Sequence, residues 1–571
     1  MNTNTKTSSQ RSIYSKTTVF ITGSTGLMGT ETVKYFLKEA PEIKLKLLIQ
    51  NFEKNTQKVI DYQKHKNIEV IFGDLRDYNS VLKGVTNSNY VLHIGGMVSP
   101  VCLNYPDETL NVNVGGAENI CKAVLAQKNK DEIKVCYIGS VAETGCRIFP
   151  THWGRCGDPI KVSVYDHYGL SKVLAEKVFV ESGIKNWVAI RMTGILTETF
   201  FTQMNPIIFH LVVNSTLEWC TKEDAGNLML KLVVEDLKGN LKNGKGKHDF
   251  WNHYYNVGSG ESYRMSNYEF VNKLMGYLNL PKMEQLYEKP SWLISKNFHG
   301  QYFLDSDDLE EFLHFRQNVD VEEYMCNCAR NAMLIAKIPY YFNVPKFVSA
   351  FFAKMLFKYI GNTKNEGALD WIKSKNTKMI NAFYGSMEEY EKIPEKWEDF
   401  EILNINKKNS DGKKYALDHG YDENKPESEI DINDCKKAAI FRGGKCLSEK
   451  MIKGDLATKL KWKCGYCQNE FLASPNLILL GGHWCDKCYI PVKKWDYDNI
   501  AKTNPFFAQV WYNNHRKDEN NVYYFDEVYD VYNCKKVKEE NKGVQYKKIC
   551  TNFCLCWILA LFFSVFFYYF N

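Results

Sequence analysis

Short apolar runs alternate with stretches of helical spacing along the first third of the chain. The runs are rich in β-branched and aromatic residues, and glycine or polar residues follow most of them. They are residues 18–21, 45–49, 68–72, 90–94, 135–138 and 188–190. The stretches between them place apolar residues three or four positions apart, as at Val33, Phe36 and Leu37. Strands that alternate with helices predict an α/β fold with a parallel sheet.

The turn after the first run has the glycine spacing of a dinucleotide-binding site. Residues 22–29 read TGSTGLMG between a predicted strand and a predicted helix. Gly23 allows the tight turn, Gly26 lets the backbone approach a pyrophosphate, and Gly29 lets helix and strand pack closely. The helix N-terminus favours the anionic phosphates. We therefore predict a Rossmann-type doubly wound sheet. The residues expected at the cofactor are Gly23, Ser24, Thr25, Gly26, Leu27, Met28 and Gly29.

Beyond residue 330 the strand and helix alternation ends. Residues 348–359 carry aromatic and aliphatic side chains at helical spacing, which favours packing against the core or a partner. A membrane-surface helix stays open, because Lys346, Lys354 and Lys358 lie within or beside this stretch.

The chain contains an uncharged apolar segment at residues 549–570. As a helix it would span about 33 Å, enough for the hydrocarbon core of a bilayer, which is about 30 Å thick. Lysines dominate residues 531–548, which favours a cytosolic position for that flank. We predict a transmembrane tail anchor with the catalytic part facing the cytosol. A buried or interfacial aromatic helix is the alternative.

The chain has 18 cysteines and no recognisable secretory signal, so clustered cysteines indicate metal ligands before disulfides. Cys464, Cys467, Cys485 and Cys488 form two Cys-x-x-Cys pairs at the spacing of a zinc ribbon. Four thiolates complete a tetrahedron around Zn²⁺ and leave no open position, so the predicted zinc is structural. Four unrelated reduced cysteines are the alternative.

Length and charge limit the classes of protein. The chain has 571 residues, 44% hydrophobic and 25% charged, which is ordinary globular composition. Its net charge of +6 is mild for this length and gives no reason to expect nucleic acid as a partner. The predicted order is a disordered tail (1–15), a dinucleotide-binding domain (16–330), a helical region with a linker (331–430), a zinc-binding module (431–530), a basic linker (531–548) and a transmembrane anchor (549–570).

Six motifs follow one another across residues 16–330. They are T-G-x-x-G-x-x-G at 22–29, G-D-L-x-D at 73–77, N-V-x-G at 113–116, Y-G-L-S-K at 168–172, the segment 219–224, and Y-N-V-G at 255–258. In this order they resemble the extended short-chain dehydrogenase/reductase superfamily, the NAD-dependent epimerase/dehydratase family.

The resemblance implies a role for each matching residue. Tyr168 would move the substrate proton, and Lys172 would lower the pKa of that tyrosine and hold the nicotinamide ribose. Ser140 would polarise the substrate, while Asp74 would contact the adenine with Leu75 beside the ring. The chemistry implied is hydride transfer between a substrate carbon and nicotinamide.

Two positions depart from the family pattern. Residues 50–51 are Gln-Asn, where an acidic residue would favour NAD; Lys54 and Lys58 follow and tilt the expectation towards NADP, while NAD stays open. Residues 141–142 are Val-Ala, where the sugar 4,6-dehydratases of the family carry Asp-Glu. Without that acid pair, elimination of water is disfavoured.

We therefore expect a membrane-anchored NAD(P)-dependent oxidoreductase or epimerase that acts on a secondary alcohol or ketone. The substrate is a nucleotide sugar or a lipid or sterol-like carbonyl, and the predicted anchor favours the lipid. A homodimer stays open. The alternative is a non-catalytic nucleotide-sensing scaffold with a structural zinc module, against which the intact Ser140, Tyr168 and Lys172 argue.

Overall fold

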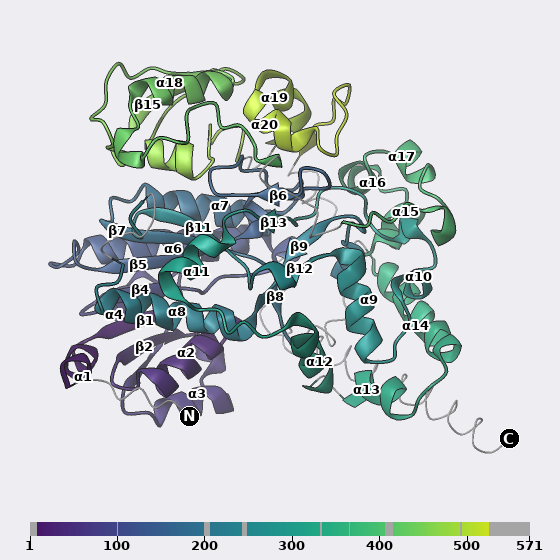
Figure 1. Cartoon of the computed structure of the whole chain (residues 1–571), viewed down its shortest axis with the longest axis horizontal. Helices are drawn as coiled ribbons and strands as arrows, with labels where there is room; N and C mark the ends of the chain where they lie inside the picture. The colour runs from purple at the N-terminus through teal and green to yellow at the C-terminus, as the bar shows by residue number, and fades with distance from the viewer. Residues whose placement is uncertain are drawn as a thin grey trace.

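A seven-stranded parallel sheet organises the N-terminal half of the molecule (Figure 1). The computed structural model describes residues 8–99, 101–198, 206–241, 248–331, 334–364, 366–405, 415–490 and 494–524. The strand order is β11-β7-β5-β4-β1-β2-β3, and all neighbouring strands are parallel. The strands are β1 (Thr18–Thr22), β2 (Lys44–Ile49), β3 (Ile68–Phe72), β4 (Tyr90–His93), β5 (Lys134–Ser140), β7 (Asn186–Met192) and β11 (His253–Val257). This order confirms the predicted Rossmann-like sheet, with the chain reversal between β1 and β4.

Sequence analysis missed one of these seven strands. The six apolar runs all form strands, because parallel strands bury both faces under helices. β11 reads HYYNV and mixes polar with aromatic residues, so it lacks the apolar run of the others. It pairs with β7 at the edge of the sheet, where Tyr254 and Tyr255 are buried.

Helices cover both faces of the sheet and form two separate cores. One face packs on α2 (Leu27–Glu39), α3 (Gln57–Gln63), α8 (Lys222–Leu237) and α11 (Ser306–Leu313). The other packs on α4 (Tyr78–Val85), α6 (Pro106–Leu125) and α7 (His167–Val180). α7 begins where it does because the Asp166 carboxylate accepts a hydrogen bond from Gly169 N at 2.9 Å and caps the helix.

Short strand pairs and helices follow the carboxyl ends of β5, β7 and β11 in the chain. The pairs are β6 (Trp153–Gly154) with β13 (Tyr302–Phe303), β8 (Ile195–Leu196) with β10 (Cys220–Thr221), and β9 (Thr216–Glu218) with β12 (Arg264–Ser266). The helices are α9 (Asn267–Tyr277), α10 (Met283–Leu286) and α12 (Val321–Asn331). In Figure 1 β9, β12 and α9 lie between the parallel sheet and the helical region on the right, and α10 lies beside α14.

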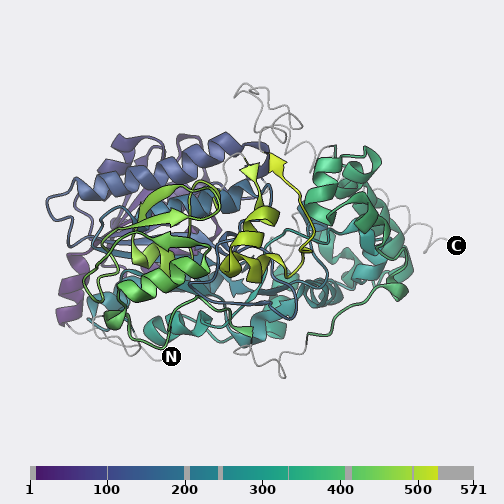
Figure 2. The same cartoon turned by 90° about the horizontal axis from the view of Figure 1, so that it is seen from above.

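The helical region forms the right-hand side of the molecule in Figures 1 and 2. It comprises α13 (Leu334–Tyr341), α14 (Lys346–Gly361), α15 (Ala368–Lys373), α16 (Thr377–Tyr384) and α17 (Met387–Glu391). α14 contains the predicted aromatic helix and packs Leu356 and Phe357 into the core. Its other face exposes Phe347, Phe351, Met355 and Tyr359, so packing accounts for only half of the apolar pattern.

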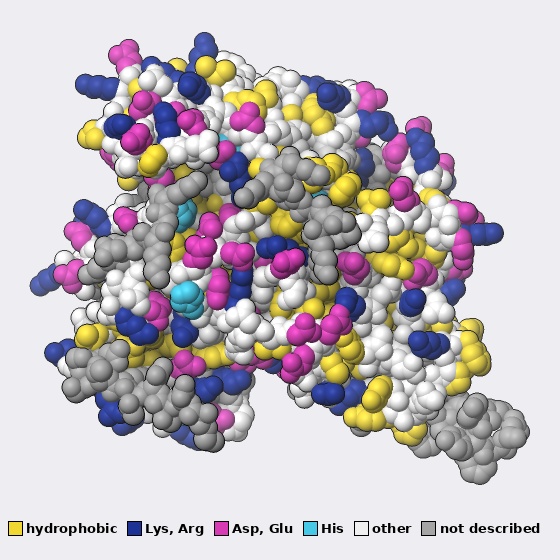
Figure 3. Space-filling model, in the orientation of Figure 1, with side chains coloured by type: hydrophobic (Ala, Val, Ile, Leu, Met, Phe, Trp, Pro, Cys, Tyr) yellow, Lys and Arg dark blue, Asp and Glu magenta, His cyan; other side chains and the backbone are white. Residues whose placement is uncertain are grey.

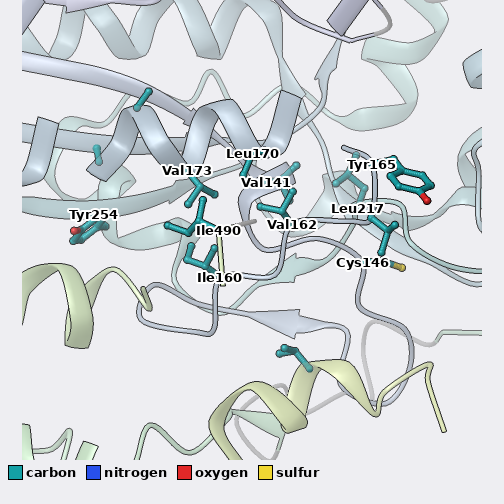
Figure 4. Packing of buried hydrophobic residues seen from close by; sticks show 14 of the residues in the cluster. Val141, Cys146, Ile160, Val162, Tyr165, Leu170, Val173, Leu217, Tyr254 and Ile490 are labelled. Atoms are coloured by element: carbon teal, nitrogen blue, oxygen red, sulfur yellow. The ribbon is translucent and has the colours of Figure 1, made fainter. Parts of the chain in front are cut away.

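The C-terminal module lies over α7 and β6 in Figure 1 and crosses the sheet domain in Figure 2. Its elements are α18 (Ile432–Phe441), β14 (Gly444–Cys446), β15 (Leu460–Cys464), β16 (Glu470–Ala473), a π-helical turn (Asn476–Leu480), β17 (Lys494–Trp495), α19 (Tyr497–Thr503), α20 (Pro505–Trp511) and β18 (Tyr523–Tyr524). Figure 4 shows Ile490 beside Ile160 and Val173, so the module and α7 share one hydrophobic core.

Part of the predicted disordered tail is ordered. Residues 8–15 form helix α1 (Ser8–Ser15), and Tyr14 is only 4% exposed because it packs in the same core as Val19 and Ile21. A tail rich in serine and threonine did not indicate this helix, since its one buried aromatic residue is too weak a pattern.

Among the described residues, no helix is long and apolar enough to cross a membrane. The longest, α6, has 20 residues but includes Asp107 and Glu108 in its first turn. α14 has 16 residues, which span about 24 Å against a hydrocarbon core of about 30 Å. This finding contradicts the predicted tail-anchored membrane localisation, which is withdrawn. The segments 531–548 and 549–570 lie outside the described residues.

Candidate active site

The glycine turn after β1 closes as tightly as its spacing predicts. Gly23 has φ +72°, and a Cβ there would lie 2.6 Å from Gly95 Cα. A Cβ on Gly29 would lie 2.1 Å from the carbonyl oxygen of Gly23. A Cβ on Gly26, in contrast, would meet only that same oxygen, at 3.4 Å. The protein itself requires glycine at positions 23 and 29, whereas position 26 is open towards a ligand that approaches the backbone.

The N-terminus of α2 offers hydrogen-bond donors at this turn. α2 begins at Leu27 after Gly26, and no side chain caps it. The Ser24 hydroxyl is buried and has no hydrogen-bond partner in the described part of the chain. Free helix N–H groups and an orphaned hydroxyl fit the diphosphate of a dinucleotide. Met28 points into the core instead, where it is 5% exposed.

Two lysines predicted near the cofactor have protein partners. Lys58 Nζ, on α3, donates to Thr25 O at 2.9 Å and to Thr30 Oγ1 at 2.8 Å. Lys54 Nζ lies 5.6 Å from the centroid of the Phe72 ring. Lys58 therefore braces the glycine turn, and neither contact discriminates NADP from NAD.

The loop after β3 carries Asp74 and Leu75, and neighbouring side chains fix both. Arg76 binds the Asp74 carboxylate through Nε at 2.9 Å and Nη2 at 2.8 Å, and these hydrogen bonds lower the pKa of Asp74. Asn119 Nδ2 donates to Leu75 O at 2.8 Å. A Cβ on Gly116 would lie 3.0 Å from Leu75 Cβ, so the N-V-x-G motif leaves room for this loop.

The structure brings the three predicted catalytic residues together. Ser140 is the last residue of β5, and Tyr168 and Lys172 lie one helical turn apart in α7. The Ser140 side chain lies near enough to Tyr168 to lower the pKa of the tyrosine. Lys172 Nζ donates to Ile138 O at 2.8 Å and lies 5.9 Å from the centroid of the Tyr168 ring. Gly96, after β4, is also close to this ammonium, because a Cβ there would be 3.7 Å from Nζ.

Burial dominates the ionisation of the two α7 side chains. Burial raises the pKa of Tyr168, and the neighbouring Ser140 side chain opposes this effect. Burial lowers the pKa of Lys172 to about 8, against the opposing charge of Glu143. We expected Lys172 to lower the pKa of Tyr168. In the structure, desolvation is the main influence on this pKa, and it raises it.

Sequence analysis did not assign three neighbours of this site. Asp166 and Cys102 are both close enough to raise the pKa of Tyr168 further. His299 Nδ1 lies 3.9 Å from Asp166 Oδ2. Gly300 pairs with Cys146, which brings the segment around His299 beside the loop that follows Ser140.

The turn after Ser140 has no free acid in the described structure. Val141 and Ala142 are buried, and Val141 is part of the hydrophobic core. Glu143 is fully buried; its Oε1 accepts from Ser140 N at 2.8 Å, and its Oε2 lies 3.3 Å from Arg191 Nε. The Glu143 carboxylate therefore binds the serine turn and pairs with Arg191.

The four predicted metal ligands also come together. Their Sγ atoms all lie within 4.8 Å of one another, with 3.7 Å between Cys464 and Cys488 and 3.5 Å between Cys467 and Cys485. The cluster joins the β15–β16 hairpin to a loop that follows it. It is a group that could hold a metal ion, and the zinc itself stays a prediction.

Comparison with known proteins points to one family. Residues 19–197 match the model of the NAD dependent epimerase/dehydratase family. UDP-glucose 4-epimerase of Rickettsia bellii is 28% identical over 172 residues, which are 30% of this chain and 44% of the relative. The same enzyme of Rickettsia typhi is 29% identical over 166 residues, 28% of this chain and 42% of the relative. The chain therefore spans less than half the length of these curated relatives.

Solved structures give similar matches. The enzyme WbmH of Bordetella bronchiseptica, in complex with NAD⁺, is 16% identical with a TM-score of 0.41, over 55% of this chain and 99% of that chain. DesIV, a dTDP-glucose 4,6-dehydratase of Streptomyces venezuelae with NAD and TYD bound, is 14% identical with a TM-score of 0.43, over 55% and 96%. The family match spans the part of the sheet domain that carries the glycine turn, Ser140, Tyr168 and Lys172.

Proposed function

We propose that this chain is an NAD(P)-dependent epimerase or oxidoreductase that acts on a nucleotide sugar. One observation carries the proposal. The Ser140 side chain lies near Tyr168, and Lys172 lies one helical turn further along α7, in the sheet domain whose first strand leads into the glycine turn. The curated relatives are named UDP-glucose 4-epimerase, which supports a nucleotide sugar over a lipid carbonyl. The predicted anchor that favoured a lipid is withdrawn.

Each side chain has a distinct part in this proposal. A bound nicotinamide supplies a hydride acceptor and donor. As a phenolate, the Tyr168 side chain takes up the proton of the substrate hydroxyl, and as a phenol it returns that proton; the Ser140 hydroxyl binds the same substrate oxygen. Lys172, with a pKa of about 8, is largely protonated at neutral pH and binds the nicotinamide ribose. Ser24 and the N-terminus of α2 bind the diphosphate.

Epimerisation or oxidation fits these residues better than dehydration. Elimination of water needs an acid and a base next to the substrate, and positions 141–142 hold buried apolar side chains. Glu143 is the nearest acid in sequence, but its carboxylate binds Ser140 N and Arg191. The site therefore keeps the tyrosine for proton transfer. At positions 141–142, where the dehydratases have an acid pair, it has apolar side chains.

The four-cysteine cluster is proposed as a structural zinc site. Four thiolates fill a tetrahedral coordination sphere and leave no position for substrate, so the metal takes no part in the chemistry. The cofactor is NAD or NADP. A homodimer stays open, and light scattering of the purified chain would decide it.

The test is conversion of a defined panel of substrates. The purified chain is incubated with NAD⁺ or NADP⁺ and with UDP-glucose, UDP-galactose, dTDP-glucose or a steroid ketone, and products are identified by NMR. The proposal expects a nucleotide sugar to be converted, with or without net reduction of the cofactor. Conversion of the steroid alone would contradict the substrate class. Cofactor binding without any conversion would favour the non-catalytic scaffold.

A further inference from the structure

The C-terminal module binds the outer side of the helix that carries Tyr168 and Lys172. Two side chains of α7 and the side chain of its C-cap residue, Glu181, bind three residues of the module, each at hydrogen-bonding distance. The pairs are Glu176 Oε1 with His483 Nε2 at 2.8 Å, Lys177 Nζ with Asp486 Oδ2 at 2.6 Å, and Glu181 Oε1 with Ser474 N at 3.0 Å. Three successive contacts along one helix indicate a specific docking surface rather than a chance approach.

The four-cysteine cluster lies within this docking surface. Asp486, which pairs with Lys177, stands between Cys485 and Cys488 in the chain, and His483 precedes Cys485 by two residues. The sulfur atoms are 3.7 Å apart in the Cys464–Cys488 pair and 3.5 Å apart in the Cys467–Cys485 pair. A tetrahedral Zn²⁺ with Zn–S bonds of about 2.3 Å requires about 3.8 Å between sulfurs, whereas a disulfide requires about 2.05 Å. The sulfur geometry therefore fits a tetrathiolate metal site.

The cluster connects two parts of the module. Cys464 and Cys467 belong to the β15–β16 hairpin, and Cys485 and Cys488 belong to the loop that carries His483. The loop itself has little regular structure, since the π-helical turn ends at Leu480. A metal held by all four thiolates would fix this loop to the hairpin, and so fix the position of His483.

A buried polar chain leads from His483 to the catalytic serine. Glu176 accepts from His483 and binds Arg191 through Nη2 at 2.7 Å and Nε at 3.0 Å. Arg191 Nε lies 3.3 Å from Glu143 Oε2, and Glu143 Oε1 accepts from Ser140 N at 2.8 Å. The side chains of His483, Glu176, Arg191 and Glu143 are all 0% exposed. Each link therefore restrains the next without competition from water.

The backbone before His483 reinforces the same contact. Arg191 Nη2 also donates to Gly481 O at 2.7 Å, so the module binds both ends of the Glu176–Arg191 ion pair. Gly482 has φ +73°, and a Cβ there would lie 1.9 Å from Asp158 O. Ile160 N donates to Gly482 O at 3.2 Å. The loop between Ser140 and α7 therefore forms part of the surface on which the module docks.

We propose that the four cysteines bind one Zn²⁺ ion and that the metal-bound module positions Ser140 through His483. His483 is a positioning residue, because it acts through Glu176, Arg191 and Glu143 and touches no reacting atom. This inference rests on the proposed function for its kinetic consequence. The metal site and the restraint on the serine turn stand independently of the substrate.

The metal is tested first, on the full chain. Zinc content is measured by plasma mass spectrometry for the wild type, for the Cys464→Ser/Cys485→Ser double variant and for Cys446→Ser. Cys446 lies in β14 of the same module, is half-buried and is outside the cluster, so it is the matched control. We expect one zinc per chain in the wild type and control and none in the double variant. Zinc-free wild type, or zinc retained in the double variant, would overturn the site.

The coupling is tested with two substitutions of one residue. His483→Gln keeps an N–H donor for Glu176, and His483→Leu removes it; both leave the four thiolates intact. We expect His483→Leu to lower kcat roughly tenfold or more at unchanged zinc content, with the KM for the cofactor little affected, and His483→Gln to restore most of the loss. Equal kcat in all three proteins, or no rescue by glutamine, would overturn the coupling.

A readout without turnover separates this inference from the proposed function. Hydrogen exchange of residues 140–146 in the full chain reports the order of the serine turn. We expect faster exchange there in His483→Leu and in the zinc-free double variant than in the wild type and Cys446→Ser. If no substrate is converted but this pattern holds, the proposed function fails and the positioning stands. Unchanged exchange in His483→Leu would contradict the positioning whatever the substrate.

Discussion

The sheet domain and the C-terminal module reach their functional geometry by different routes. In the sheet domain, single short motifs set the geometry: residues 22–29 form the turn, and Tyr168 and Lys172 share one turn of α7. In the module, the cysteines come from a hairpin and a loop, and His483 meets a partner 307 positions earlier in the chain. The comparison teaches that local motifs identify the residues of the candidate site, whereas the residues that hold the serine turn in place are brought together by docking between distant segments.

On the face drawn in Figure 3, Lys and Arg side chains are interspersed with Asp and Glu side chains.

The largest expected effect lies at the junction of the two regions. Arg191→Met removes the guanidinium that pairs with both Glu176 and Glu143. Two buried carboxylates then lose their ion-pair partner. We expect a loss of about 3–5 kcal/mol in the free energy of unfolding, measured by chemical denaturation. Lys461→Met is the control, because its pair with Glu470 is 53% and 46% exposed and should contribute less than about 1 kcal/mol. Similar losses in the two variants would contradict the importance of this junction.

Three glycine-to-alanine substitutions dissect the sheet domain alone. Gly29→Ala should destabilise the fold, because its Cβ would collide with Gly23 O. Gly26→Ala should leave the melting temperature nearly unchanged and raise the Kd for the cofactor about tenfold or more, because only the phosphate approaches that side. Gly115→Ala is the control, since its Cβ would meet no atom within 4 Å. Calorimetry and cofactor titration measure both quantities, and unimpaired binding by Gly26→Ala would argue against the assigned phosphate position.

A smaller, pH-dependent effect is expected at the cap of α7. Burial raises the pKa of Asp166 from 3.8 to about 6. The folded state then holds the proton more tightly than the unfolded state, so this stabilising contribution is complete below about pH 3.8 and is lost as pH rises through about 6. Asp166→Asn keeps a good cap and removes the titration.

The stability of Asp166→Asn relative to the wild type should therefore increase by about 3 kcal/mol between a pH below 3.8 and mildly alkaline pH. Denaturation at several pH values measures this difference. Asp77→Asn is the control, because Asp77 also caps a helix but hydrogen bonds from Ser80 lower its pKa. A pH-independent difference for Asp166→Asn would show that Asp166 is not the titrating group.

The smallest effect is expected on the outer face of α14. Phe351 is 63% exposed, so Phe351→Ser should change the free energy of unfolding by less than about 0.5 kcal/mol. Phe357, on the inner face, is 5% exposed, and Phe357→Ala should cost about 3–5 kcal/mol. A large loss in Phe351→Ser would mean that the exposed face is covered in solution.

Much of the fold follows from local sequence, and the missing parts have physical causes. Buried parallel strands need apolar runs, which is why six strands were predicted, whereas β11 at the sheet edge tolerates its Tyr-Tyr-Asn sequence. The contact between Asp166 and His299, like the one between Glu176 and His483, depends on how distant segments pack. Neither contact leaves a periodicity or a spacing in the sequence. The cysteine spacing predicted that four thiolates meet, and it carried no information about the helix they would adjoin.

The central claim is that Tyr168 performs proton transfer, while the glycine turn and Lys172 provide most of the binding of the cofactor. The most direct measurement is turnover of the best nucleotide sugar from the panel by Tyr168→Phe, alongside cofactor titration of the same protein. The account predicts a loss in kcat of roughly a hundredfold to ten-thousandfold with a cofactor Kd close to that of the wild type. Wild-type turnover by Tyr168→Phe would contradict the account.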